Sequence, residues 1–280
     1  MDRLRLTLTD KLLIIYELIL SALIMLSSRP GIATGKHLTI NAVLIIAILL
    51  LNSIPSSHRS MQFLHRFYPI FLMAWLYPQA CELRWLFHGQ EFDAILLNWE
   101  RIIIGRELYL DFARWPLPVL EFFHGIYFFY YLGLFLFAFR AWQQQHPLVP
   151  AYVFTLTFSS LLHHIFIIAF PASGPPLLRP DIMPDGVIFI PMMNWIYNNV
   201  DRGGGAFPSL HVASTVIFTI FALRFSPRFR TGKLVFAILI LCSTVIGSFH
   251  YTIDTATGAW TGLLAYFAGT WLFQQWEQPR

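Results

Sequence analysis

The sequence has few charged residues. Of its 280 residues only 12% are Asp, Glu, Lys or Arg, whereas 56% are hydrophobic and 17% aromatic. A soluble domain carries about 25% charged residues, so the chain lacks the polar surface that a water-exposed domain of this size needs. This composition excludes a disordered chain, a collagen-like chain and a protein that coats nucleic acid. Cysteine is scarce as well: Cys81 and Cys242 both lie in apolar stretches and form neither a disulfide framework nor a zinc pattern.

Long apolar segments predict the fold. A helix needs about 20 mostly apolar residues to cross the hydrocarbon core of a bilayer. The sequence predicts an all-α, polytopic membrane helix bundle with about eight transmembrane helices, near 11–28, 38–55, 67–88, 118–139, 149–170, 207–225, 233–250 and 257–275. We expect the segment 91–115, where aromatic and charged residues alternate, to lie in the membrane interface. Glu82 and Arg84, near the end of the third segment, are interpreted as a buried ion pair.

The positions of the basic residues predict an orientation. Cytoplasmic loops are enriched in Lys and Arg. With the N-terminus in the cytoplasm, eleven of the nineteen Lys and Arg residues fall on the cytoplasmic side. The bias is strongest in the short loop 226–232, which holds Arg228 and Arg230 between Arg224 and Lys233. We therefore expect both termini in the cytoplasm and the loops around 171–206 and 250–256 on the periplasmic, lumenal or extracellular face.

Three polar segments interrupt the apolar pattern on that outer face. They read FPASGPPLLRP over 170–180, GGGAFPSLH over 203–211 and HYTID over 250–254. Because successive spans alternate in direction, all three segments are predicted to meet at one side of the membrane.

The residue types in these segments suit phosphoryl transfer. Two histidines, His211 and His250, can act as nucleophile and acid, and Asp254 can hold an imidazole ring when it lies one helical turn away. Arg179 can bind phosphate oxygens through two N–H groups, and the glycine-rich run before a helix favours an anion. Asp254 could instead only cap the last helix, and the glycines could form a plain turn. No carboxylate cluster suggests magnesium and no Cys/His spacing suggests zinc, so we expect no metal and no cofactor.

These segments resemble motifs of a known family. Pro208-Ser209-Leu210-His211 resembles the second motif, Pro-Ser-Gly-His, of the type 2 phosphatidic acid phosphatase superfamily. Ser243, His250 and Asp254 have the spacing of its third motif, and Arg179-Pro180 matches the end of its first. Two basic positions of the motifs differ, because Ala172 stands where the family has Lys and Thr244 where it has Arg. In the loss of these two basic residues, and in the sequences around His211 and His250, the chain is similar to the inositol-phosphorylceramide synthase (inositolphosphotransferase) branch of the superfamily.

The resemblance implies a fold and a role for each matched residue. It implies a six-helix, phosphatidic-acid-phosphatase-like catalytic domain over 61–280, preceded by N-terminal transmembrane helices over 1–60. His250 would be the nucleophile that forms a phosphohistidine, Asp254 its orienting partner and His211 the acid for the leaving oxygen. The residues expected to bind the substrate phosphate are Arg179, Ser209, Gly204, Gly205 and, on proximity alone, Arg202.

We therefore expect metal-independent phosphoryl transfer on a lipid phosphate ester. The partners would be the lipid substrate, the surrounding membrane lipid and an acceptor. With an alcohol such as inositol or a lipid hydroxyl as the acceptor, the protein would be a phosphotransferase of sphingolipid type. The missing Lys and Arg favour this interpretation. Water as the acceptor makes it a lipid phosphate or pyrophosphate phosphatase. A non-enzyme, transporter-like protein that keeps the motifs as an anion site is the remaining alternative, although paired broken helices typical of transporters do not occur in the sequence.

Overall fold

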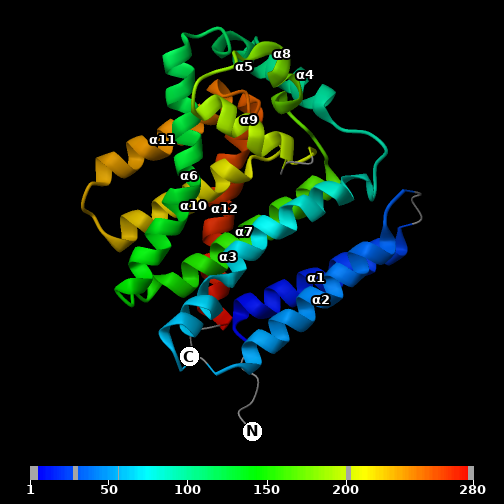
Figure 1. The fold of residues 1–280 in the computed structure, drawn as a ribbon, viewed down its shortest axis with the longest axis vertical. Coiled ribbons are helices and arrows are strands. Elements are labelled where there is room, and N and C mark those ends of the chain that lie inside the picture. The colour runs from blue at the N-terminus through cyan, green and yellow to red at the C-terminus, as the bar shows by residue number, and fades with distance from the viewer. Residues whose placement is uncertain (1–5, 28–30, 56, 200–202, 277–280) are drawn as a thin grey trace.

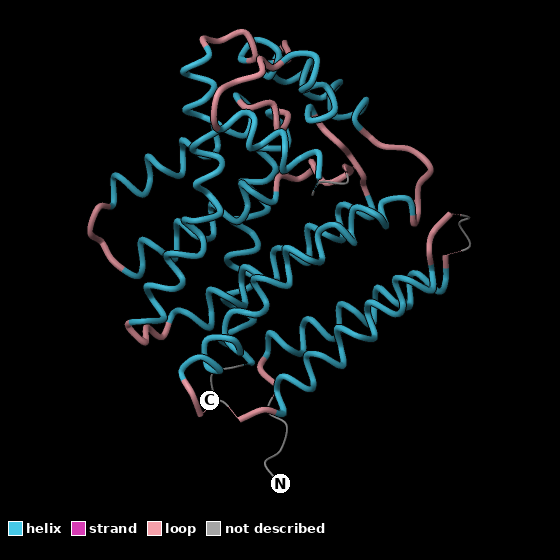
Figure 2. Tube along the Cα trace, in the orientation of Figure 1, coloured by secondary structure: helices cyan, strands magenta, loops and turns pink. Residues whose placement is uncertain are grey.

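The computed structural model describes residues 6–27, 31–55, 57–199 and 203–276. This part of the chain is a helical bundle without a strand, which confirms the all-α prediction (Figure 2). The β pairing within it is limited to an isolated parallel bridge between Ala172 and Gly205. That bridge lies in the polar region where the sequence predicts the functional site.

Long helices cover each of the expected apolar segments. In the described residues they are α1 (Leu8–Leu26), α2 (Thr34–Ser53), α3 (Arg59–Glu82), α6 (Leu117–Gln143), α7 (Leu148–Ala169), α10 (Leu210–Phe225), α11 (Arg230–Ile246) and α12 (Thr252–Trp276). Three of these, α2, α6 and α7, are long and apolar enough to cross a membrane, and α10 is a shorter apolar helix. The number of helices that actually cross the bilayer stays a prediction.

The third segment differs in its bounds from the expectation. Its helix begins at Arg59 rather than near 67 and passes at Glu82 into a 3₁₀ turn, η1 (Leu83–Trp85). Glu82 and Arg84 each have an ion-pair partner on another segment. Lys36 Nζ lies 2.5 Å from a Glu82 oxygen, and Arg84 Nε lies 3.1 Å from a Glu91 oxygen. These contacts connect the turn after α3 to α2 and to the segment before α4, and an ion pair between Glu82 and Arg84 themselves stays a prediction.

Short helices cover one end of the bundle, at the top of Figure 1. The expected interfacial piece 91–115 forms two of them, α4 (Asp93–Ile104) and α5 (Leu108–Phe112), separated at Gly105, whose positive φ of 82° ends α4. The loop before α10 holds η2 (Pro175–Leu178), α8 (Arg179–Ile182) and α9 (Phe189–Asn199). These pieces surround the three polar segments.

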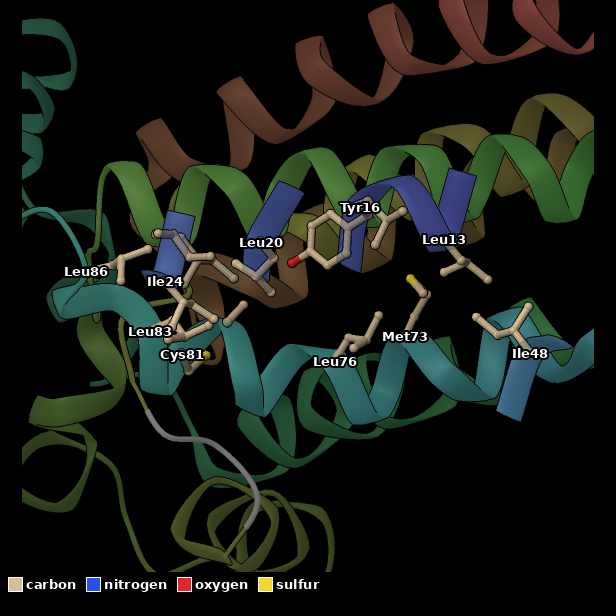
Figure 3. Close-up of a cluster of buried hydrophobic side chains, with 14 residues drawn as sticks. Leu13, Tyr16, Leu20, Ile24, Ile48, Met73, Leu76, Cys81, Leu83 and Leu86 are labelled. Atoms are coloured by element: carbon tan, nitrogen blue, oxygen red, sulfur yellow. The ribbon is translucent and has the colours of Figure 1, made fainter. Parts of the chain in front are cut away.

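The N-terminal helices pack on the rest of the bundle through an apolar face. Leu13, Leu20 and Ile24 of α1 are at most 3% exposed and pack against Met73 and Leu76 of α3 (Figure 3). Helix α2 joins this layer through buried polar groups as well, since the side-chain amides of Gln79 and Asn41 lie 2.6 Å apart. Such hydrogen bonds between side chains of neighbouring helices commonly stabilise the packing of membrane helices.

Helices α10 and α12 approach each other at backbone distance. A Cβ added at Gly258 would lie 2.5 Å from the Ser209 carbonyl oxygen, and one added at Gly262 would lie 2.6 Å from Ala213 Cα. Glycine is therefore required at both positions, since atoms that far inside contact distance cannot be accommodated. This contact brings the first turns of α10 and α12, which carry His211 and Asp254, to the same end of the bundle.

Candidate active site

The three polar segments meet through backbone hydrogen bonds. Ala172 N donates to Gly204 O at 3.1 Å and Ala206 N donates to Ala172 O at 2.8 Å, which joins the first segment to the second. Ser209 N donates to Asp254 O at 3.1 Å, which joins the second to the third. The structure thus brings together three segments through hydrogen bonds between residues that lie 32 to 45 positions apart in the chain.

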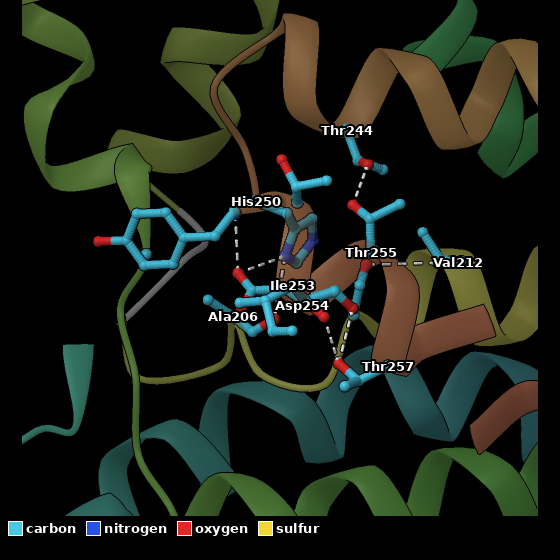
Figure 4. A network of polar contacts seen from close by, with 12 residues as sticks. Ala206, Val212, Thr244, His250, Ile253, Asp254, Thr255 and Thr257 are labelled. Carbon is cyan, nitrogen blue, oxygen red and sulfur yellow. Dashed lines mark hydrogen bonds and ion pairs between the residues drawn. The ribbon is translucent and has the colours of Figure 1, made fainter. Parts of the chain in front are cut away.

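His250 lies in the turn just before α12 and is 3% exposed. Its Nδ1 lies 2.9 Å from the Ala206 carbonyl oxygen (Figure 4). A carbonyl can only accept a hydrogen bond, so Nδ1 carries a proton, and in the neutral ring Nε2 keeps its lone pair. Within the described part of the chain, no group hydrogen bonds Nε2. The ring is therefore held in the tautomer that a nucleophile needs.

Asp254 lies in the first turn of α12 and is fully buried. Its Oδ2 accepts a hydrogen bond from Tyr251 N at 2.9 Å and lies 3.7 Å from His250 Nδ1. The carboxylate thus caps the start of α12 and is also a charged neighbour of the imidazole. At 3.7 Å the contact is electrostatic rather than a hydrogen bond, and the Ala206 carbonyl makes the directional contact.

His211 lies in the first turn of α10, with its ring centroid 5.8 Å from that of His250. Its Nε2 lies 2.9 Å from the hydroxyl of Tyr131 on α6. The rings of Tyr127, Tyr130 and Tyr131 surround it, with centroids 4.9–5.7 Å away. Sequence reasoning missed Tyr131, because one tyrosine in an aromatic run of a membrane helix has no distinguishing spacing.

Arg179 begins α8 and is 3% exposed. Its guanidinium donates to the Gly247 carbonyl and, at 2.8 Å, to Asn194 Oδ1, and it lies 3.2 Å from His124 Nε2. Burial lowers the pKa of Arg179 to about 10, while the Tyr197 and Tyr127 hydroxyls oppose that shift, so the group stays charged at neutral pH. Three of its five N–H donors are thus engaged within the described residues.

A cavity of about 220 Å³ lies beside Arg179. Its lining includes Asn194 and Tyr197 of α9 and Asp185 from the preceding loop. The Arg179 guanidinium stands 4.2 Å from the Phe249 ring, one residue before His250. This arrangement links the cavity to the turn that carries His250.

The remaining predicted phosphate-binding residues have identifiable local roles. Ser209 is the N-cap of α10, and its Oγ accepts from Val212 N at 3.4 Å. Gly204 N donates to Ser173 Oγ at 2.9 Å, and Gly204 has a positive φ of 83°. A Cβ added at Gly204 or Gly205 would lie 2.3 Å from Arg84 Cδ or 2.4 Å from the Tyr77 hydroxyl, respectively. Arg202 lies outside the described residues. A role of these residues in phosphate binding stays a prediction.

The two basic positions missing from the motifs lie in the interior. Ala172 is fully buried within the backbone pairing, and Thr244 Oγ1 lies 2.7 Å from Thr255 Oγ1 (Figure 4). No group of three or more His, Cys, Asp or Glu that could hold a metal ion occurs in the described ranges. The geometry instead provides an unprotonated imidazole nitrogen, a second histidine, a carboxylate and a guanidinium.

The region from 96 to 268 matches the family model of the PAP2 superfamily. This match covers more than half of the chain, which therefore belongs to the PAP2 superfamily. No curated protein and no solved structure showed significant similarity to the chain. Membership, together with the three long apolar helices, identifies a membrane protein and supports lipid phosphoryl transfer of the phosphatase type as its general activity. The match begins after α3, so it does not test the expected boundary between 1–60 and 61–280.

Proposed function

We propose that the protein transfers a phosphoryl group from a lipid phosphate ester to an alcohol, in two steps through a phosphohistidine on His250. The observation that carries this proposal is the hydrogen bond between His250 Nδ1 and the Ala206 carbonyl, 2.9 Å long. This hydrogen bond leaves the lone pair on Nε2 of His250, close to a second histidine, His211. The ring of His211 in turn contacts the hydroxyl of Tyr131, a side chain that is exposed at the surface.

In the first step, the Nε2 lone pair of His250 attacks phosphorus. The bond from phosphorus to the leaving oxygen breaks, and protonated His211 gives its proton to that oxygen. In the second step, the acceptor hydroxyl attacks phosphorus and gives its proton to neutral His211. The N–P bond breaks and its electron pair returns to Nε2. Throughout, the proton stays on Nδ1 of His250, which donates it in a hydrogen bond to the Ala206 carbonyl, and the Asp254 carboxylate stabilises positive charge on the ring.

The acceptor distinguishes a phosphotransferase from a phosphatase. The absence of cationic side chains at Ala172 and Thr244 supports the transferase, as does the similarity of the motif wording to the inositol-phosphorylceramide synthase branch. Water as the acceptor is the second candidate, supported by membership of the PAP2 superfamily. In either reaction we expect metal-independent chemistry.

We further propose that eight helices cross the membrane, with the site on the outer face and both termini in the cytoplasm. The start of α1, the end of α12 and the turn between α6 and α7 lie toward the lower part of Figure 1, away from the short helices around the site. The Lys and Arg residues of the 226–232 loop support the same orientation.

The test is a product assay on the purified protein. Radiolabelled lipid phosphate mono- and diesters are offered with and without inositol and a lipid alcohol, and products are identified by mass. We expect acid-labile labelling of the protein and a phosphorylated alcohol as product, both lost in His250→Ala. Free phosphate as the sole product would select the phosphatase, and turnover without labelling of His250 would contradict the two-step mechanism.

A further inference from the structure

Helix α4 presents two acidic residues to the segments of the site. Asp93 and Glu100 are seven residues apart, which places them on one helix face two turns apart. Asp93 Oδ2 accepts from Ser173 N at 3.0 Å and Oδ1 from Gly174 N at 2.7 Å. Glu100 Oε1 accepts from Thr252 N at 3.1 Å and Oε2 from Ile253 N at 2.9 Å. One side of α4 thus contacts the first and the third polar segments.

Glu100 accepts hydrogen bonds from the backbone N–H groups at the start of α12, although it belongs to another helix. The first N–H groups of any α-helix lack partners within the helix, and a carboxylate there also interacts favourably with the helix dipole. Glu100 is fully buried and uses both of its oxygens for this purpose. The two residues that it holds, Thr252 and Ile253, are the first two of α12.

His250 is connected to this anchored start by a single residue. Tyr251 separates His250 from Thr252, and Tyr251 N donates to Asp254 in the first turn of α12. Burial and the nearby Asp93 carboxylate raise the pKa of the Tyr251 phenol, which therefore keeps its proton and donates to Asp93 Oδ1 at 3.3 Å. A displacement of the start of α12 must therefore displace the His250 ring.

From this geometry we propose that Glu100 is a positioning residue that holds His250 in line with the substrate phosphorus. The inference rests on the proposed phosphohistidine mechanism. Reacting atoms must meet at about 3–3.5 Å, and a misplacement of about 1 Å costs roughly 100-fold in rate. Glu100 touches no reacting atom and acts through the backbone of Thr252 and Ile253.

The decisive variant is Glu100→Gln. Glutamine keeps the length of the side chain but offers one acceptor oxygen, so its NH₂ group faces one of the two backbone N–H groups. The matched control is Asp10→Asn, which alters another buried helix-capping carboxylate, at the start of α1 and remote from the site. Both variants are compared with the wild type at equal amounts of folded protein in detergent.

The readouts are the single-turnover rate of His250 labelling by a radiolabelled lipid phosphate, and kcat and KM in steady state. For Glu100→Gln we expect the labelling rate and kcat to fall about 100-fold with KM little changed. The control should keep both rates, although it loses thermal stability. Wild-type labelling rates in Glu100→Gln would overturn the proposal. A wild-type protein that never labels on His250 would instead overturn the proposed function.

A second variant removes the same contact from the other side. Thr252→Pro deletes one of the two N–H donors, and proline is favoured at the first residue of a helix. If Glu100 acts through this backbone group, the double variant should be little slower than the slower single variant. Multiplicative losses would contradict the proposal. If Glu100→Gln alone fails to fold, Thr252→Pro by itself carries the test, because a wild-type labelling rate in that variant would overturn the proposal.

Discussion

Replacing Asp254 by Asn tests how the structure divides the task of holding His250. The Ala206 carbonyl already fixes the tautomer through its 2.9 Å contact with Nδ1. Asp254 adds a negative charge 3.7 Å from the same atom. Asparagine keeps an oxygen that can accept from Tyr251 N, so the start of α12 should stay in place. The variant therefore removes the charge with little change in geometry.

The magnitude follows from the distance. Two unit charges about 4 Å apart interact by about 4 kcal/mol at the effective dielectric constant of roughly 20 that suits protein sites. Each 1.36 kcal/mol, approximately, is a factor of ten in rate, so Asp254→Asn should lower turnover by about 10³. This is less than the loss of about 10⁴ seen when the equivalent change in a serine protease triad also produces the wrong tautomer.

The assay is lipid turnover at saturating substrate, with His250→Ala as the lower limit and Asp111→Asn as control. Asp111 of α5 forms an exposed ion pair with Arg106, and Asp111→Asn should leave turnover unchanged. A loss in Asp254→Asn as large as that in His250→Ala would show that the Ala206 carbonyl does not hold the tautomer. A loss under tenfold would show that the charge does not act on the reacting ring.

The other predictions concern the guanidinium, metal and sidedness. Arg179→Lys should lower turnover by about 10²–10³, because a lysine ammonium cannot reproduce the planar contacts with the Gly247 carbonyl and Asn194; near-normal turnover would mean that Arg179 only anchors α8. Excess chelator should leave activity intact, and a saturable, reversible requirement for magnesium would indicate a mechanism in which metal bridges the phosphate oxygens. A cysteine placed within 228–230 should be protected from an impermeant thiol reagent in sealed vesicles of native orientation, whereas one within 183–186 should be labelled; the reverse pattern would place the chemistry in the cytoplasm.

The helices and the meeting of the three segments could be predicted from the sequence. Apolar runs of about 20 residues have few alternatives to a helix in a membrane protein, and alternation of direction then brings every second connection to one face. The bounds of α3 were less predictable, because its first turns are polar and precede the apolar run. The same holds for 91–115, where the break at Gly105 divides one expected piece into two helices.

The contacts that organise the site could not be predicted in the same way. The partner of His250 is the carbonyl of Ala206, and a backbone acceptor exists at every residue, so it leaves no signal in the sequence. Glu100 stands in an amphipathic segment where a charged residue normally faces water. Its burial follows from the docking of α4 on α12, which depends on contacts between residues about 150 positions apart.

The glycine contact between α10 and α12 divides the substrate environment into a rigid side and an adaptable side. Because the two helices touch through backbone atoms at Gly258 and Gly262, no side chain between them can change rotamer to alter their spacing. The spacing between the first turns of α10 and α12, which carry His211 and Asp254, is thus set by the main chain. For the proposed reaction, we expect different head groups to be recognised from the opposite side, where α6 and α9 contribute long side chains such as Tyr131 and Asn194. Exchange of residues on those helices is therefore the route by which this scaffold could accept a new lipid without losing its chemistry.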